Sequence, residues 1–308
     1  MQTILGAGGS IGIELAKVLP DYTDKIRLVS RNPTKVNETD ELFAGSLLNK
    51  DEVLNAVEGS DVVYLTAGLK YRINIWKAQW PVIMQNVIEA CKTHKSKLVF
   101  FDNVYMYDRN ELNHMTEKTS VRPSSEKGIV RQQIAKLLME AVEKGEIQGL
   151  IARSADFIGP KNSVPTEIIA KNLMKGKSAQ WMASLDKIHS LTDTYDAGKG
   201  TAMLGNSNTA YNQVWHLPTD ATPLTAQGWV DLFAMELNAK PKCTVLPIWL
   251  MGILGLFNGD IKELKEMAYQ YDRDYYFDST KFCQRFEYKP STPEASVKRV
   301  CDCLSNKE

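Results

Sequence analysis

Hydrophobic residues in the first half of the chain follow two alternating patterns. Short runs such as residues 97–101 are apolar without alternation, which is typical of strands buried on both faces of a parallel sheet. Between these runs lie segments with apolar residues at helical spacing, the longest at residues 127–144. Repeated strand–helix units of this kind predict a doubly wound, mainly parallel α/β sheet.

The boundaries of the expected elements follow from the same pattern. We predict strands at residues 3–5, 25–30, 42–44, 61–66, 97–101 and 150–152. We predict helices at residues 11–19, 51–57, 80–92 and 127–144. Pro81 would then lie in the first turn of its helix, where proline fits.

A glycine-rich turn joins the first predicted strand to the first predicted helix. Gly6, Gly9 and Gly12 form the pattern G-x-x-G-x-x-G at this position. The first glycine allows a tight turn, the second lets the backbone approach a pyrophosphate, and the third lets helix and strand pack closely. The amides that begin the helix, at Ser10 and Ile11, would bind the phosphates. The pattern therefore predicts a Rossmann dinucleotide site.

The regular alternation fades after residue 160, and four of the six tryptophans lie beyond it. We predict a Rossmann domain over residues 1–160, with return segments at about residues 187–216. A smaller α+β substrate lobe would comprise residues 161–186 and 217–308.

The residues after the second predicted strand bear on the choice of cofactor. An acidic side chain there would accept hydrogen bonds from the ribose 2′-hydroxyl of NAD. The sequence has Ser30 and Arg31 instead. Because an arginine can form two parallel hydrogen bonds to a phosphate, these residues favour NADP over NAD. The alternative for Arg31 is a solvated surface side chain.

The fourth predicted strand ends at Thr66, and two small residues, Ala67 and Gly68, follow it. They would let a cofactor lie against the backbone. Lys70 is within reach of the pyrophosphate in this arrangement, or else it is exposed after a turn.

Composition excludes several classes of partner. The formal net charge is zero, with 37 basic and 37 acidic residues and no basic tract, so a nucleic-acid partner is not expected. The five cysteines lack disulfide or zinc spacing. We therefore expect free thiols in the cytoplasm and no metal site. The first strand begins almost at Met1, which leaves no room for a signal peptide.

The longest apolar run covers residues 245–257 and contains Pro247, Gly252 and Gly255. It is shorter than the ~20 residues that span a bilayer. We expect a buried helix or pocket wall here, with a helix on a membrane surface as the alternative.

Several segments together resemble the extended short-chain dehydrogenase/reductases, the group that includes nucleotide-sugar epimerases and dehydratases. They are the glycine turn and residues 67–70, 103–107, 153–160, 189–197, 277–282 and 288–290. The resemblance extends over nearly the whole chain. It implies NAD(P)-dependent chemistry on a small carbonyl or sugar-type substrate, with a further cofactor contact at Ser154. It also implies a homodimer, in which helices 80–92 and 127–144 of two chains form a four-helix bundle.

The chain departs from this family at its catalytic residues. Typical members have a Ser or Thr after the fifth strand and a Tyr-x-x-x-Lys pair on the next long helix. Aligned in this way, the chain has Asn103 in place of the serine, Lys127 in place of the tyrosine and Arg131 in place of the lysine. The resemblance therefore implies an atypical member.

Chemistry could still be supplied by other groups. Lys127, Tyr105 and Tyr107 are the candidate proton donors, and Lys127 qualifies if its surroundings lower its pKa. Asn103 could donate a hydrogen bond to a carbonyl oxygen, and Arg131 could bind ribose hydroxyls. The alternatives are a solvated Lys127 and tyrosines that belong to the core. A protein that binds NADP as a sensor or regulator, without catalysis, remains the second hypothesis.

Overall fold

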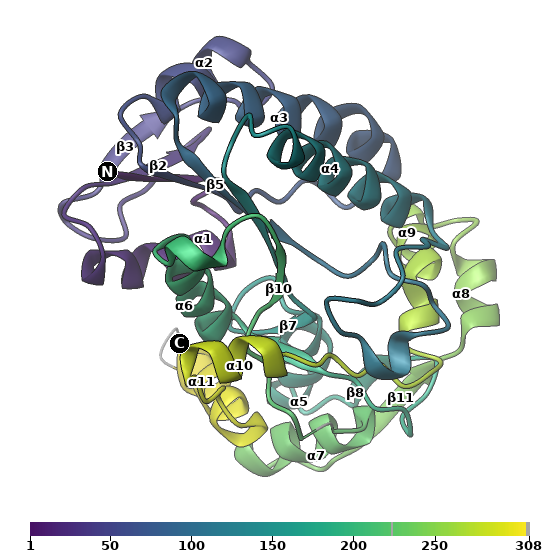
Figure 1. Cartoon of the computed structure of the whole chain (residues 1–308). Coiled ribbons are helices and arrows are strands. Elements are labelled where there is room, and N and C mark those ends of the chain that lie inside the picture. Colours follow the sequence, from purple (N-terminus) through teal and green to yellow (C-terminus); the bar gives the residue numbers. More distant parts are fainter. Residues whose placement is uncertain (223, 306–308) are drawn as a thin grey trace. The chain divides into compact units, whose positions relative to one another are not determined.

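A seven-stranded parallel sheet forms the centre of the fold, in a computed structural model that describes residues 1–222 and 224–305. Its strand order is β10-β6-β5-β4-β1-β2-β3 (Figure 1). The strands are β1 (Gln2–Leu5), β2 (Ile26–Ser30), β3 (Glu41–Ala44), β4 (Val62–Leu65), β5 (Lys97–Asp102), β6 (Gly149–Arg153) and β10 (Val214–His216). Every neighbouring pair is parallel. This confirms the α/β sheet predicted from the apolar runs.

Burial within the sheet explains why its strands do not alternate. All residues of β1, β4 and β6 are buried, because helices pack on both faces. The edge strand β3 is largely exposed. The strand order changes direction at β1, since β1 pairs with β2 on one side and with β4 on the other. In open α/β sheets, ligands bind beyond the strand ends at such a switch point.

Helices cover both faces of this sheet. The bounds are α1 (Ser10–Val18), α2 (Lys50–Val57), α3 (Ile73–His94), α4 (Glu126–Glu143) and α6 (Thr194–Gly205). Side chains from α2, α3 and α4 share one hydrophobic core with the sheet. The helices α1 and α6 lie on the other face (Figure 1), where Gly198 packs against Glu14. No helix in the described part of the chain is long and apolar enough to cross a membrane.

The third helix begins earlier than its sequence predicts. It starts at Ile73, so Pro81 lies inside it and not in its first turn. The prediction is wrong because Trp76 and Trp80, both buried, extend the core-facing stripe by another turn at i,i+4 spacing. The carbonyl that Pro81 leaves without its helical partner belongs to Lys77, which is exposed.

The chain divides into two compact units. The first comprises Met1–Met106, Glu126–Ser154 and Ala197–Leu217 and contains the seven-stranded sheet. The second comprises Tyr107–Ser125, Ala155–Asp196 and Pro218–Glu308.

The second unit mixes short strands and helices. Its strands form two parallel pairs, β7 (Asp156–Ile158) with β9 (Leu191–Asp193) and β8 (Ala179–Met182) with β11 (Cys243–Leu246). Its helices are α5 (Lys171–Met174), α7 (Ala226–Glu236), α8 (Ile248–Leu254), α9 (Gly259–Met267), α10 (Thr280–Phe286) and α11 (Pro293–Ser305). Shorter helical turns are η1 (Leu19–Asp21) and η4 (Asn208–Ala210) beside the sheet, and η2 (Leu112–His114), η3 (Thr166–Ala170) and η5 (Ala268–Gln270) in this unit. Trp181, Trp229 and Phe233 lie in its core.

The apolar run at residues 245–257 is not the buried helix that we expected. It begins in strand β11 and continues as α8, in which only Met251 is buried. Trp249 is 68% exposed and Phe257 88% exposed. A seven-residue helix has one inward face, so an all-apolar sequence leaves its remaining side chains in solvent.

Candidate functional site

The glycine turn has the geometry of a close backbone crossing. Gly6 has a φ of +99°, and a Cβ there would lie 2.4 Å from the Cα of Ala67. A Cβ on Gly12 would lie 2.8 Å from the Cα of Ala7. Side chains at these two positions would therefore collide with main chain. The turn brings the end of β1 against the segment that follows β4.

The other two glycines of the turn are not required by the chain itself. A Cβ on Gly9 would have its nearest neighbour at 3.6 Å, an ordinary contact, and a Cβ on Gly8 would meet nothing within 4 Å. Gly9 is the N-cap of α1 and provides no side-chain cap, and the first turn contains no acidic residue. Backbone amides at an uncapped helix start bind anions.

The end of β2 carries no carboxylate. Ser30 closes the strand and its Oγ is buried without a hydrogen-bond partner among the described residues. Arg31 follows and is exposed. A buried hydroxyl in this state normally has a partner, so a ligand hydroxyl or phosphate would satisfy it.

The end of β4 faces the glycine turn. The amide of Thr66 donates to the carbonyl of Leu5 at 2.9 Å, which fixes the two strand ends together. Ala67 contacts Gly6, as described above, and a Cβ on Gly68 would meet nothing within 4 Å. Lys70 is exposed, and its carbonyl accepts a hydrogen bond from the indole of Trp76 at 3.1 Å.

Lys127 is fully buried on α4, with no exposed surface. The solvated side chain considered from the sequence is therefore excluded. Its Nζ lies over the ring of Tyr71, 4.6 Å from the ring centre. The hydroxyl of Tyr71 is 3.5 Å from that of Tyr105, and Tyr105 stacks on Trp76. The sequence could not show this burial because Tyr71 precedes α3, Trp76 lies in α3 and Tyr105 lies in the loop after β5.

Arg131, one turn further along α4, is also buried. Its Nε donates to Oδ1 of Asp102 at 2.7 Å, and its Nη2 bonds the same oxygen at 2.5 Å. The guanidinium carbon lies 4.6 Å from the ring centre of Trp80 and 4.9 Å from that of Phe100. Arg131 is thus held at its edge by a carboxylate and on its faces by aromatic rings.

Asp102 is the residue of this cluster that sequence reasoning missed. It ends β5 and it is 1% exposed. Its Oδ1 also accepts the amide of Asn103 at 2.9 Å, and its Oδ2 accepts Nε of Arg153 at 3.4 Å. The only sequence signal was a carboxylate that directly follows a buried apolar strand.

The remaining candidates fall in different places. Ser154 is buried in the first unit, and its amide donates to the carbonyl of Asp102. Asn103 is partly buried and its Oδ1 accepts the amide of Tyr105 at 3.1 Å. Tyr107 belongs to the second unit, where it is buried and forms an isolated bridge with Val121.

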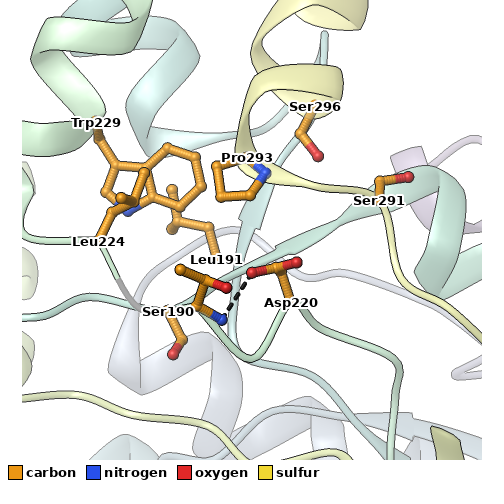
Figure 2. A pocket seen from close by; sticks show the side chains of 9 residues that line it. Ser190, Leu191, Asp220, Leu224, Trp229, Ser291, Pro293 and Ser296 are labelled. Atoms are coloured by element: carbon orange, nitrogen blue, oxygen red, sulfur yellow. Dashed lines mark hydrogen bonds between the residues drawn. The ribbon is translucent and has the colours of Figure 1, made fainter.

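The second unit contains a small cavity near the C-terminal helix. Ser190, Leu191, Asp220, Trp229 and Ser291 are among its lining residues (Figure 2). Its volume is about 10 Å³, which holds about one water molecule. A sugar or a nucleotide does not fit there.

His189 of the second unit is a packed histidine. It is 2% exposed and its ring is stacked between those of Tyr271 and Tyr275. Its Nε2 lies 3.0 Å from Oδ2 of Asp156, which also accepts the hydroxyl of Tyr271 at 2.9 Å. The contact with Asp156 accounts for Nε2 of a ring that is otherwise packed against aromatic groups.

Solved structures of sugar-nucleotide enzymes share this fold. The UDP-glucose 4-epimerase of Thermus thermophilus, solved with NAD, superimposes with a TM-score of 0.78 at 15% identity, covering 99% of this chain and 99% of that chain. The UDP-glucuronic acid 4-epimerase of Bacillus cereus, also with NAD, has a TM-score of 0.80 at 15% identity and covers 99% and 97%. The dTDP-glucose 4,6-dehydratase of Bacillus anthracis in complex with NAD has a TM-score of 0.81 at 14% identity and covers 100% and 97%.

Sequence comparison gives the family. No curated protein matches this sequence. The sequence model of the NAD dependent epimerase/dehydratase family matches residues 3–201, which include the glycine turn, the aromatic residues around Lys127 and the ion pair of Arg131. The chain therefore belongs to the NAD dependent epimerase/dehydratase family.

Proposed function

We propose that this protein binds a nicotinamide dinucleotide at the glycine turn and is an epimerase/dehydratase-like oxidoreductase. The observation that carries the proposal is the uncapped start of α1, where Gly9 provides no side-chain cap and the first turn contains no acidic residue. Family membership supports it, and so do the NAD complexes of proteins with the same fold.

Residues near the carboxyl ends of the strands are proposed to bind each part of the dinucleotide. The pyrophosphate would bind the backbone amides of Ser10, Ile11 and Gly12. The adenosine ribose would lie by Ser30 and Arg31, and the chain near Thr66, Ala67 and Gly68 would pass beneath the cofactor. Lys70 would reach the pyrophosphate. The nicotinamide ribose would bind Arg131, and Ser154 would be a further cofactor contact. These residues all belong to the first unit.

NADP is the dinucleotide that we expect to bind more tightly. The end of β2 carries no carboxylate that would repel a 2′-phosphate, the buried Oγ of Ser30 has no partner among the described residues, and Arg31 is exposed and able to form a bidentate pair. NAD remains the alternative, since the family and the related complexes use it.

The nicotinamide ring, when bound, would accept a hydride from the substrate or return it. Lys127 would hold the proton that the substrate oxygen loses or gains, because it is the buried ionisable group on the face of α4 that also carries Arg131. The side-chain Nδ2 of Asn103 would donate a hydrogen bond to that oxygen. Tyr105, through the hydroxyl pair with Tyr71, is the second candidate proton donor. The substrate would be a small carbonyl or sugar-type molecule.

A catalytically inactive nucleotide sensor is the second candidate function. The absence of a Tyr-x-x-x-Lys pair at the start of α4 favours it. The burial of Lys127 beside tyrosine rings favours a catalytic protein, because a buried lysine does not contribute to solubility.

The proposal extends to the oligomeric state and the cellular compartment of the protein. Val82 on α3 and Ile129 on α4 are exposed apolar residues, which supports a homodimer through these helices. The five free thiols suit the reducing cytoplasm.

The binding proposal is tested by titration calorimetry with NAD and NADP. Gly9→Ala should fold with an unchanged melting temperature, because its Cβ meets only ordinary contacts, but it should weaken both nucleotides by roughly tenfold or more, because the methyl group occupies the approach of the pyrophosphate. Gly8→Ala is the matched control at a neighbouring open position. Arg31→Ala should weaken NADP much more than NAD.

Three outcomes would count against the proposal. Wild-type protein that gives no heat with either nucleotide would remove the cofactor site. An unchanged affinity of Gly9→Ala for both nucleotides would show that the turn is not where the pyrophosphate lies. A ratio of NADP to NAD affinity that does not change in Arg31→Ala would remove the phosphate contact.

A further inference from the structure

Asp102 joins three elements of the first unit through one buried carboxylate. Its Oδ1 accepts hydrogen bonds from Arg131 on α4 and from the amide of Asn103 after β5. Its Oδ2 accepts Nε of Arg153 on β6. Two of these three partners are residues that the proposed function places next to the nicotinamide and the substrate.

The bonds to Arg131 use one edge of its guanidinium. Nε and Nη2 bond Asp102, and Nη2 also donates to the carbonyl of Phe101 at 3.3 Å. Trp80 and Phe100 lie against the guanidinium at 4.6 and 4.9 Å. The aromatic rings fix the plane of the guanidinium, and Asp102 fixes one of its edges. Nη1 is then the nitrogen left to bind a ligand, and its N–H groups point in one fixed direction.

The stability of the fold does not by itself explain this arrangement. A buried ion pair contributes little net stability compared with well-packed apolar residues, yet here the side chain of Arg131 is only 5% exposed and that of Asp102 is fully buried. The charges are retained at the end of β5, beside the end of β4, where the cofactor is proposed to bind.

We propose that Asp102 is a positioning residue, which holds Arg131 so that its Nη1 binds the ribose of the nicotinamide half of the dinucleotide. The inference rests on the proposed cofactor site. It also explains why an arginine stands in this place: a lysine ammonium would pair with Asp102 as a point charge and would have no second donor fixed at an angle to the first.

The test compares two ligands that share one half. ADP contains the adenosine and the diphosphate that bind the glycine turn, and NAD contains these together with the nicotinamide ribose. Asp102→Asn should weaken NAD by roughly tenfold, the value of about one charge-assisted hydrogen bond, while the dissociation constant of ADP changes by less than about twofold. A purely structural role would move both ligands together.

Arg131→Lys provides the second variant. It keeps the positive charge beside Asp102 but lacks Nη1, so it should show the same loss for NAD and not for ADP. The double variant should be no weaker than either single one, because both act on the same contact. The control is Tyr64→Phe, which removes a buried hydroxyl that donates to Gln2 at 2.7 Å, at the start of β1 and away from the glycine turn.

The possible results separate the two proposals. If wild-type protein binds neither NAD nor ADP, the proposed function fails. If it binds both, and NAD and ADP weaken in parallel in Asp102→Asn or NAD does not weaken at all, the positioning role is overturned and the cofactor site stands. Should Asp102→Asn not fold, as shown by circular dichroism, an unchanged affinity of Arg131→Lys for NAD overturns the role, because Asp102 acts through Arg131.

Discussion

Two buried cations on α4 differ in what their chemistry allows. Arg131 is paired with a carboxylate, whereas Lys127 lies over the face of a tyrosine ring. A guanidinium keeps its protons throughout the ordinary pH range, whereas an amine is able to release and regain one. In the proposed function, Arg131 therefore provides charge and orientation, and Lys127 is the group proposed to transfer the proton.

Substitution of Lys127 separates charge from proton transfer. Lys127→Met keeps the buried stem and Lys127→Arg keeps the charge, but neither can exchange a proton near neutral pH. We expect both to lower turnover by about 100-fold or more, with NAD affinity within about threefold of wild type. The measurement is chromatographic conversion of UDP-glucose and UDP-glucuronic acid as probe substrates. Full turnover in Lys127→Arg would show that only the charge matters, and full turnover in both would exclude Lys127.

The elements of the first unit could be predicted well because each carries its own signal. The apolar runs of β1, β4 and β5 identify buried strands, and the glycine turn identifies the strand–helix crossing. The pairing of Asp102 with Arg131 joins residues 29 positions apart, and it depends on how α4 lies against β5, which no local pattern encodes. The start of α3 was misplaced because Pro81 is a stronger local signal than the two tryptophans that precede it.

The helix α8 shows where composition is a poor guide to burial. Its apolar sequence predicts a buried helix, but most of its side chains do not pack in the core of the second unit. Trp249 and Phe257 are largely exposed, whereas Met251 has no exposed surface. These side chains therefore differ in what they contribute to stability, although the sequence makes them look alike.

Denaturant unfolding of variants in α8 and at Phe257, which follows this helix, measures this difference. Trp249→Ser and Phe257→Ser should change the free energy of unfolding by no more than about 0.5 kcal/mol and should reduce self-association. Met251→Ala should cost about 2–5 kcal/mol, because it leaves a cavity in the core. A large loss in Trp249→Ser would mean that this helix is covered in the folded protein.

At the scale of the whole molecule, the two units share one chain that passes between them repeatedly. Each unit is built from three separate segments, and the last segment of the first unit, Ala197–Leu217, lies between two segments of the second along the sequence. Release of that segment would lengthen the loops of the second unit and raise the entropy cost of keeping it folded. We therefore expect the units to open together.

Two buried cysteines report on the two units separately. Cys91 lies in the core of the first unit and Cys301 in that of the second. Burial raises the pKa of the Cys91 thiol well above its usual range and that of Cys301 to about 12. Because the thiolate is the reactive form, labelling of either cysteine near neutral pH requires local or global opening.

Labelling rates of single-cysteine variants, with the other cysteines replaced by serine, test cooperative opening. A ligand that binds only the folded state at 100 times its Kd stabilises it by about 2.7 kcal/mol, so NAD should slow labelling of Cys91 by about 100-fold. If the units open together, NAD slows Cys301 by the same factor, although its proposed contacts lie in the first unit. An unchanged rate at Cys301 beside a slowed Cys91 would show that the units open independently. An unchanged rate at both would mean that NAD does not stabilise the unit that contains the glycine turn.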